Sequence, residues 1–321
     1  MLITLLIITL IGYLTINVSL NKKDLAYFNK IKYGQKVDVN GHLMNICIFG
    51  EKNNQTIVIS PGLMSFSPYY EFKPLAEALS DKYKVVIIEP FGYGISDNVD
   101  DERTVDKIST EIHTAIKQLG IKKYYFLAHS FSGLYALKIA IEYPDEILGI
   151  IGIDTSVPHQ TDEFMDDFEI RISEILVLLN KGANTVGITK LINKIKPGML
   201  LVIDEKYEYT PEEIEEINFL ALKKSPTKIQ YKEASNARKN IDAVRDLKFP
   251  NTIPIFNLIA QASIKTSKNW GDWKELHNRI ITETDNSEIT VINGNHYLHL
   301  VRKDVVVSNI KRWLEKVENK N

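Results

Sequence analysis

The stretch Phe126-Leu127-Ala128-His129-Ser130-Phe131-Ser132-Gly133 decides the fold. The apolar residues directly before it are typical of a strand, and the apolar residues 134–141 after it are typical of a helix. A strand that turns into a helix within a residue or two strains the backbone of its central residue, and small neighbours such as Ala128 and Ser132 permit that strain. The stretch therefore predicts a sharp turn that exposes the Ser130 hydroxyl near a helix N-terminus, where unpaired N–H groups favour negative charge. An ordinary strand-loop-helix joint that contains a serine is the alternative.

The composition is that of an ordinary folded chain. It has 321 residues, of which 44% are hydrophobic and 25% are charged, enough for one large domain with an insertion or for two domains. The net charge of -2 and the lack of Lys/Arg-rich tracts argue against a nucleic-acid partner. Cys47 is the single cysteine, which excludes an internal disulfide and a cysteine-based zinc site. Its apolar surroundings predict a buried structural thiol.

The N-terminus is less ordinary. Residues 1–20 contain no charged side chain, are rich in Leu and Ile, and would span roughly 30 Å as a helix, the thickness of a bilayer core. They predict an uncleaved single-pass transmembrane anchor. A cleaved signal peptide is the alternative, but neither a basic n-region nor a cleavage site is evident. The lysines between residues 22 and 32 favour the cytoplasm for the rest of the chain, although Asp24 weakens that cue and leaves the side of the membrane open.

The remaining chain alternates between expected strands and helices. The dipeptide Asn40-Gly41, suited to a tight hairpin turn, separates the first two strands. Short apolar runs then alternate with helical periodicity, which argues for a parallel sheet covered by helices on both faces. The expected strands are residues 36–39, 44–48, 56–60, 85–88, 124–127, 148–153, 255–260 and 288–292, and the expected helices between and after them are 70–79, 104–119, 134–141, 273–281 and 305–317.

The alternation breaks in residues 155–250, where helical stretches are expected at 163–179 and 186–195 and no strand is evident. Another helix should begin at Thr210, because Thr210-Pro211-Glu212-Glu213 has a capping threonine, a first-turn proline and a glutamate three residues after the cap. A helical insertion within an α/β domain is most simply a cap or lid. The predicted organisation is a transmembrane anchor (1–20), a first core part (21–154), a helical cap (155–250) and a second core part (251–321).

Three reactive side chains follow strands of the expected sheet. Ser130 ends one strand, Asp154 ends the next, and His296 follows the last. Ligands of an open parallel sheet bind beyond the carboxyl ends of its strands, so these side chains should meet there. A serine hydroxyl becomes a good nucleophile when an imidazole takes its proton, and a buried carboxylate orients that imidazole. The order serine, acid, histidine along the chain is the one expected of a single fold class.

From about residue 36 to residue 317 the chain resembles the α/β-hydrolase superfamily with a helical cap, and the resemblance rests on four motifs. They are Ala128-His129-Ser130-Phe131-Ser132-Gly133, similar to the nucleophile elbow with alanine in place of its commoner first glycine; Glu89-Pro90-Phe91-Gly92-Tyr93-Gly94-Ile95-Ser96-Asp97, similar to the glycine-rich loop after the fourth strand; Gly294-Asn295-His296-Tyr297-Leu298-His299, similar to the catalytic histidine segment; and Ser60-Pro61-Gly62-Leu63, where the family has His-Gly. The resemblance implies an α/β fold with a mostly parallel eight-stranded sheet flanked by helices.

The resemblance also implies an oxyanion hole made by the backbone N–H groups of Leu63 and Phe131. Pro61, in place of the family's histidine, leaves the Leu63 N–H available but removes a side chain that often braces the loop. The acid is where the chain departs from the family, whose members commonly carry it a few residues beyond the seventh strand. Asp154, at a position that some members use, is the predicted acid, and Asp272 is the alternative. Either carboxylate could instead serve only as a cap.

Other candidates fit less well. His299 lies close to His296, but the equivalent residue of the family is usually structural. The ring of His129 should pack against the sheet and not reach the proton of Ser130. Gly92-Tyr93-Gly94 lacks the third glycine of a dinucleotide site and the lysine of a P-loop, and no metal-ligand spacing is evident. Neither a cofactor nor a metal is therefore expected.

The predicted function is that of a membrane-tethered serine hydrolase without a cofactor that cleaves a carboxylic ester, with an amide or thioester as second choices. Ser130 would be the nucleophile, His296 the base and Asp154 its partner. The expected partner is a small-molecule ester, and a membrane anchor would favour a lipid-derived one. A membrane-anchored binding or scaffolding protein on the same fold is the alternative, motivated by Pro61 and by the missing acid after the seventh strand. The sequence indicates neither the natural substrate nor the oligomeric state.

Overall fold

The computed structural model describes residues 22–160, 202–267, 272–282, 284 and 286–319. Contacts divide the chain into two units, Met1–Gly34 and Gln35–Asn321. In the first unit, residues 22–28 are helical. The second unit contains all the elements that are discussed below.

An eight-stranded sheet forms the centre of the second unit, in the order β1-β2-β4-β3-β5-β6-β7-β8. Strands β1 and β2 form an antiparallel hairpin, β2 pairs antiparallel with β4, and all later pairs are parallel. The strands are β1 (Gln35–Val39), β2 (His42–Phe49), β3 (Thr56–Ser60), β4 (Lys84–Glu89), β5 (Tyr124–His129), β6 (Ile147–Ile153), β7 (Ile255–Ala260) and β8 (Glu288–Ile292). The mostly parallel eight-stranded sheet that the sequence predicted is confirmed.

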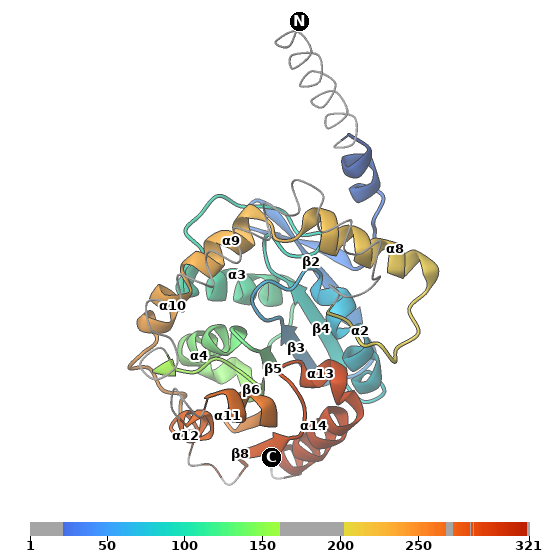
Figure 1. Cartoon of the computed structure of the whole chain (residues 1–321). Helices are drawn as coiled ribbons and strands as arrows, with labels where there is room; N and C mark the ends of the chain where they lie inside the picture. The colour runs from blue at the N-terminus through green and yellow to red at the C-terminus, as the bar shows by residue number, and fades with distance from the viewer. Residues whose placement is uncertain (1–21, 161–201, 268–271, 283, 285, 320–321) are drawn as a thin grey trace, which may run out of the picture. The chain divides into compact units, whose positions relative to one another are not determined.

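Helices cover both faces of this sheet, as the alternating pattern predicted. Helix α3 packs beside α4 on one side, whereas α2 packs beside α13 and α14 on the other (Figure 1). Because both faces are covered, a central strand such as β5 is buried at every position and reads as a continuous apolar run. The helices outside the insertion are α2 (Pro68–Leu79), α3 (Val105–Gln118), α4 (Ser132–Glu142), η1 (Pro144–Glu146), α11 (Gln261–Ser267), α12 (Trp273–Asn278), α13 (Leu298–Val301) and α14 (Lys303–Glu318).

The hairpin turn between β1 and β2 has the conformation that its sequence favours. Asn40 and Gly41 have φ values of 56° and 82°, in the left-handed region that asparagine and glycine tolerate best. The N–H of Gly41 donates to the carboxylate of Asp38 at 3.1 Å. The predicted burial of Cys47, on β2, is also confirmed.

The regular elements of the described chain between β6 and β7 are helices: α8 (Pro211–Phe219), the π-helical turn η2 (Leu220–Lys224), α9 (Lys228–Ser235) and α10 (Ala237–Ala243). The predicted start at Thr210 is confirmed, because Thr210 and Glu213 form a reciprocal capping box. The expected helices at 163–179 and 186–195 lie outside the described residues. The extent of a helical cap, residues 155–250, stays a prediction.

The prediction of a single-pass membrane protein is corrected by the structure. Within the described ranges, no helix is long and apolar enough to cross a membrane. The longest of them, α14, has 16 residues and would extend only about 24 Å, and it carries lysine, arginine and glutamate side chains. The segment predicted as the anchor, residues 1–20, lies outside the described part of the chain.

Candidate active site

The turn between β5 and α4 holds Ser130 in a strained conformation. Its φ is 52°, a left-handed value that is uncommon for a residue with a side chain. Ser132 fixes the turn, because its hydroxyl accepts the N–H of His129 at 3.0 Å and donates to the carbonyl of Ser60 at 2.9 Å. A Cβ at Gly133 would lie 2.5 Å from the carbonyl oxygen of Ser156, so the sharp entry into α4 requires glycine there.

The structure brings Ser130, His296 and Asp154 together at the carboxyl edge of the sheet. The Nε2 atom of His296 lies 2.8 Å from the Oγ of Ser130, and its Nδ1 lies 2.7 Å from the Oδ2 of Asp154. Ser130 and Asp154 follow the neighbouring strands β5 and β6, and His296 precedes α13. The carboxylate is buried, whereas the side chain of His296 is 40% exposed. The three groups form a continuous path from a buried charge to an accessible hydroxyl.

Asp154 is held by donors besides His296. Its Oδ1 accepts the N–H of Ala260 at 3.0 Å and the indole N–H of Trp273 at 3.2 Å, and its Oδ2 accepts the hydroxyl of Ser263 at 2.5 Å. Burial alone would raise the pKa of Asp154, but the hydrogen bond and charge of His296, together with the Ser263 and Ala260 donors, lower the pKa below its ordinary value. The carboxylate is therefore ionised at neutral pH.

Asp272, the alternative acid, makes a different contact in the structure. It precedes α12, and its carboxylate accepts the N–H of Glu275 at 3.1 Å as the N-cap of that helix. The capping role that the sequence also allowed for Asp272 is the one that the structure gives it. The neighbouring Trp273 and Ser263, which sequence reasoning missed, are the residues that reach Asp154 from this part of the chain.

The loop of residues 61–66, called here the oxyanion loop, passes directly over the serine turn. A Cβ at Gly62 would lie 2.9 Å from the Cβ of Ser130, so a glycine is required at this crossing. The backbone N–H groups of Leu63 and Phe131 make no hydrogen bond to any described residue. A cavity of about 70 Å³ is lined by this loop, Ser130 and His296. Two free donors and the serine thus belong to neighbouring segments beside one cavity.

The glycine-rich motif after β4 is built around a buried carboxylate. Glu89 accepts four hydrogen bonds at 3.0–3.2 Å, from the side chains of Asn45 and Ser67 and from the N–H groups of Tyr69 and Ile95. These bonds join β2, the start of α2 and the glycine-rich loop. These contacts give Glu89 a structural role in the motif.

A second group of polar side chains is buried beside the cavity, which Glu71 and His129 help to line. Sequence reasoning considered its two histidines and missed Glu71. Glu71, on α2, accepts a hydrogen bond from Ser65 at 2.5 Å and lies 2.9 Å from the Nε2 of His299. The Nδ1 of His129 is 3.7 Å from the same carboxylate. The Nε2 of His129 lies 3.3 Å from the carbonyl oxygen of His296, so His129 braces the histidine loop. The sequence signal was a glutamate among the core-facing positions of a largely apolar helix.

These buried groups have strongly shifted pKa values. Burial lowers the pKa of His129 far below its ordinary value and lowers that of His299 to about 3, so both rings are neutral. Burial raises the pKa of Glu71. The three side chains offer ligand atoms within 4.8 Å of one another, a spacing that the fold creates from residues far apart in sequence. In the structure, however, Glu71 is already bonded to Ser65 and His299.

Comparisons with known proteins agree with this architecture. A family model described as the alpha/beta hydrolase fold matches residues 55–174. The uncharacterized protein YbdG of Bacillus subtilis (strain 168) is 35% identical over 128 residues, 40% of this chain and 39% of that protein. Epoxide hydrolase 1 of Caenorhabditis elegans is 31% identical over 81 residues, 25% of this chain and 20% of that protein. The chain thus spans less than half the length of these curated relatives.

A solved structure extends the likeness to nearly the whole fold. The enol-lactonase of Burkholderia xenovorans LB400 superposes with a TM-score of 0.60 and 18% identity, covering 88% of this chain and all of that protein (100%). At this identity the superposition shows a shared fold. The similarity in sequence comes from the family model and from the motifs around Ser130. The chain therefore has the α/β-hydrolase fold, and its residues 55–174 match the model of that family.

Proposed function

We propose that the protein is a serine hydrolase that cleaves a carboxylic ester through an acyl-enzyme. The observation that supports this most directly is the hydrogen-bonded chain from the Asp154 carboxylate through His296 to the Ser130 hydroxyl, with contacts of 2.7 and 2.8 Å. In this arrangement the imidazole can take the serine proton, and the buried anion stabilises the imidazolium that forms. Amides and thioesters are second choices for the same chemistry.

The reaction follows from the geometry in two halves. The Oγ of Ser130 attacks the carbonyl carbon while its proton passes to the Nε2 of His296, and the tetrahedral intermediate carries negative charge on the former carbonyl oxygen. His296 then returns the proton to the leaving alkoxide as the carbon–oxygen bond breaks, which leaves an ester on Ser130. A water molecule, deprotonated by the same imidazole, releases the acid by the reverse sequence.

The oxyanion would be stabilised by the N–H groups of Leu63 and Phe131. Both are free of hydrogen bonds to the described residues, and the Phe131 N–H lies at the start of α4, where the helix dipole favours negative charge. A single donor of this kind can contribute about 3 kcal/mol to catalysis. The donor is the backbone N–H of Leu63 and does not depend on the side chain at position 61. Pro61, in place of the family's histidine, is therefore compatible with this role.

Ester hydrolysis is favoured over epoxide opening by the identity of the nucleophile. Epoxide hydrolases of this superfamily use an aspartate at the elbow, and this chain has Ser130. Ser130 would form an ordinary acyl-enzyme from a carboxylic ester. The epoxide reaction, in contrast, proceeds through an ester on the carboxylate of an aspartate nucleophile, which is then hydrolysed. The name of the enol-lactonase, whose fold this chain shares, is in keeping with an ester substrate.

The proposal is tested by turnover of p-nitrophenyl esters of graded acyl length. We expect a preferred chain length, a burst of p-nitrophenol equal to the enzyme concentration where deacylation is slow, and a loss of kcat/KM of at least about 10³-fold in Ser130→Ala. Full turnover by Ser130→Ala would exclude Ser130 as the nucleophile. No turnover of any ester by the folded wild type would favour a non-catalytic binding protein.

A further inference from the structure

Helix α9 of the inserted segment bonds directly to the oxyanion loop. The Nε2 of Gln230 donates to the carbonyl of Ser65 at 2.6 Å, and both residues are buried. The Oε1 of the same amide accepts the N–H of Thr227 at 2.9 Å in the capping box of α9. Because the capping bond fixes which way the amide faces, its N–H group points at the loop. The start of α9 and the position of Ser65 are thus coupled through one side chain.

A second connection runs through Tyr93. Its hydroxyl accepts the N–H of Met64 at 3.3 Å and donates to the carboxylate of Glu233 on α9 at 3.0 Å. Met64 follows Leu63 and has a φ of 68°, a strained value for a residue with a side chain. A strained residue keeps its conformation only where its surroundings impose it. The bond from Met64 to Tyr93 is one such restraint.

Glu233 has a second partner that does not touch the loop. Its other carboxylate oxygen accepts the hydroxyl of Tyr135, on α4. Glu233 is 2% exposed, so both tyrosines donate hydrogen bonds to the same buried carboxylate. Tyr93 and Tyr135 therefore differ in one respect that matters here, since Tyr93 alone also bonds to the oxyanion loop.

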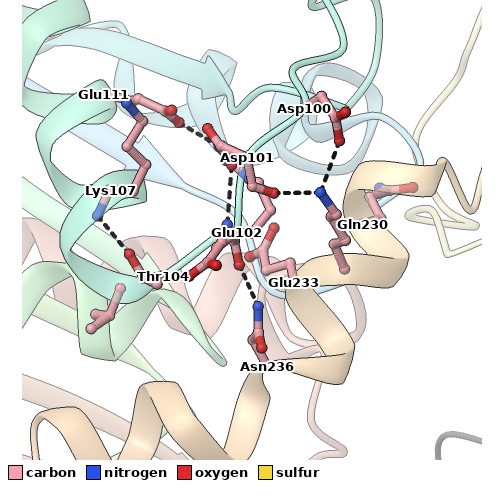
Figure 2. A network of polar contacts seen from close by, with 12 residues as sticks. Asp100, Asp101, Glu102, Thr104, Lys107, Glu111, Gln230, Glu233 and Asn236 are labelled. Atoms are coloured by element: carbon pink, nitrogen blue, oxygen red, sulfur yellow. Dashed lines mark hydrogen bonds and ion pairs between the residues drawn. The ribbon is translucent and has the colours of Figure 1, made fainter.

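Helix α9 is in turn fixed from its outer side. Lys232 donates to the carboxylate of Asp100 at 2.8 Å and to the carbonyl of Asp101 at 2.9 Å, and Asn236 donates to the carbonyl of Glu102. Figure 2 shows the bond between Asn236 and Glu102, with Asp100 and Asp101 facing α9 and Glu233 on the same helix. Its outer side is therefore fixed to residues 100–102, and its inner side is bonded to the oxyanion loop. Through the inner bonds, a displacement of α9 would move the loop with it.

We propose that α9 positions the oxyanion hole, with Gln230, Glu233 and Tyr93 as positioning residues that hold the Leu63 N–H toward the reacting carbonyl. This inference rests on the proposed ester hydrolysis. It gives the inserted segment a part in the chemistry. Because an oxyanion donor bonds more strongly to the transition state than to the substrate, its misplacement lowers kcat and leaves KM nearly unchanged.

A matched pair of variants tests the inference. Tyr93→Phe and Tyr135→Phe each remove one hydrogen bond from Glu233, and only Tyr93→Phe releases Met64. With p-nitrophenyl butyrate as the probe, Tyr93→Phe should lower kcat about tenfold with KM changed less than about twofold, whereas Tyr135→Phe should change kcat less than about twofold. Gln230→Met, which loses the bond to Ser65, should behave like Tyr93→Phe. Thermal unfolding of each variant measures the structural cost separately.

A trifluoromethyl ketone, which forms an oxyanion on the serine, gives a second readout. Its inhibition constant should rise in Tyr93→Phe by the same factor by which kcat/KM falls. Equal losses of kcat in the two tyrosine variants, or a raised KM with an unchanged kcat, would overturn the role of α9 and leave the ester hydrolysis intact. A wild type that neither hydrolyses the ester nor binds the ketone would overturn both proposals, and so would a fully active Ser130→Ala.

Discussion

Asp154 occupies a position at which one carboxylate satisfies four donors. His296 and Ser263 bond to one oxygen, and Ala260 and Trp273 bond to the other. An anion that is satisfied in this way is costly to replace, because an amide offers hydrogen atoms where the site provides only donors. The surroundings of Asp154 therefore select an ionised acid.

We predict that Asp154→Asn lowers kcat by roughly 10²–10⁴-fold, because the amide no longer stabilises the imidazolium and favours the wrong tautomer of His296. Asp272→Asn is the matched control, since asparagine is an equally good N-cap and Asp272 serves as the cap of α12. It should change kcat less than about twofold. Steady-state kinetics with one ester measures both variants, and the reverse ranking would reassign the acid to Asp272.

At the scale of elements, the sequence predicted all eight strands along the chain, because each buried strand is a continuous apolar run and each turn has its own chemistry. It could not predict α11, since Gln261–Ser267 has no apolar periodicity and follows β7 without a loop. That helix places Ser263 on Asp154, and the next one places Trp273 there. Contacts of this kind depend on tertiary packing, which residue spacing does not encode.

The sequence predicted the part of the candidate site that lies at the ends of the strands. Ser130, Asp154 and His296 each end or follow a strand, so the edge of the sheet brings them together whatever the loops do. Glu71, in contrast, lies in the first turn of α2, and its neighbours His129 and His299 come from two other elements. Only the packing of a helix against the sheet makes these three residues a group.

The junction of β5 and α4 gives a prediction for an element. Gly133→Ala places a Cβ 2.5 Å from the backbone carbonyl of Ser156, which cannot move as a flexible side chain could. We expect a loss of about 1–3 kcal/mol in the free energy of unfolding and a reduced kcat, since the turn that carries Ser130 must shift. Gln118→Ala, at an exposed position of α3, is the control and should leave both unchanged. Urea unfolding and ester kinetics measure the two effects, and an unperturbed Gly133→Ala would show that the crowding at this turn is unimportant.

At the scale of the whole molecule, several histidines are buried in the neutral form. Burial lowers the pKa of His277, whose Nδ1 lies 2.8 Å from the carbonyl oxygen of Trp273, and it also lowers the pKa values of His129 and His299. An unfolded histidine gains a proton below about pH 6.5, and the folded one does not. The stability from each buried ring is therefore complete above that pH and is lost as the pH falls from there toward the lowered pKa. The buried carboxyls of Glu71 and Glu233, with raised pKa values, act in the opposite sense.

Because these contributions oppose one another, we compare the pH dependence of the free energy of unfolding between the wild type and a variant. His277→Asn should make the free energy of unfolding less dependent on pH between 7.5 and 5.5, by up to about 1.4 kcal/mol per pH unit at the lower end. Leu276→Val, a buried neighbour without a titrating group, should lower stability without changing the slope. Urea unfolding at a series of pH values measures both, and equal slopes for wild type and His277→Asn would show that His277 takes up its proton in the folded state.

Labelling with a fluorophosphonate tests most directly whether Ser130 is a nucleophile activated by His296. The reagent forms a bond to an activated serine, and mass spectrometry of the digested protein identifies the modified residue. We predict one adduct, on Ser130, formed at least about 10²-fold more slowly in His296→Ala and absent from Ser130→Ala. A folded wild type that stays unlabelled, or equal labelling of wild type and Ser130→Ala, would contradict it.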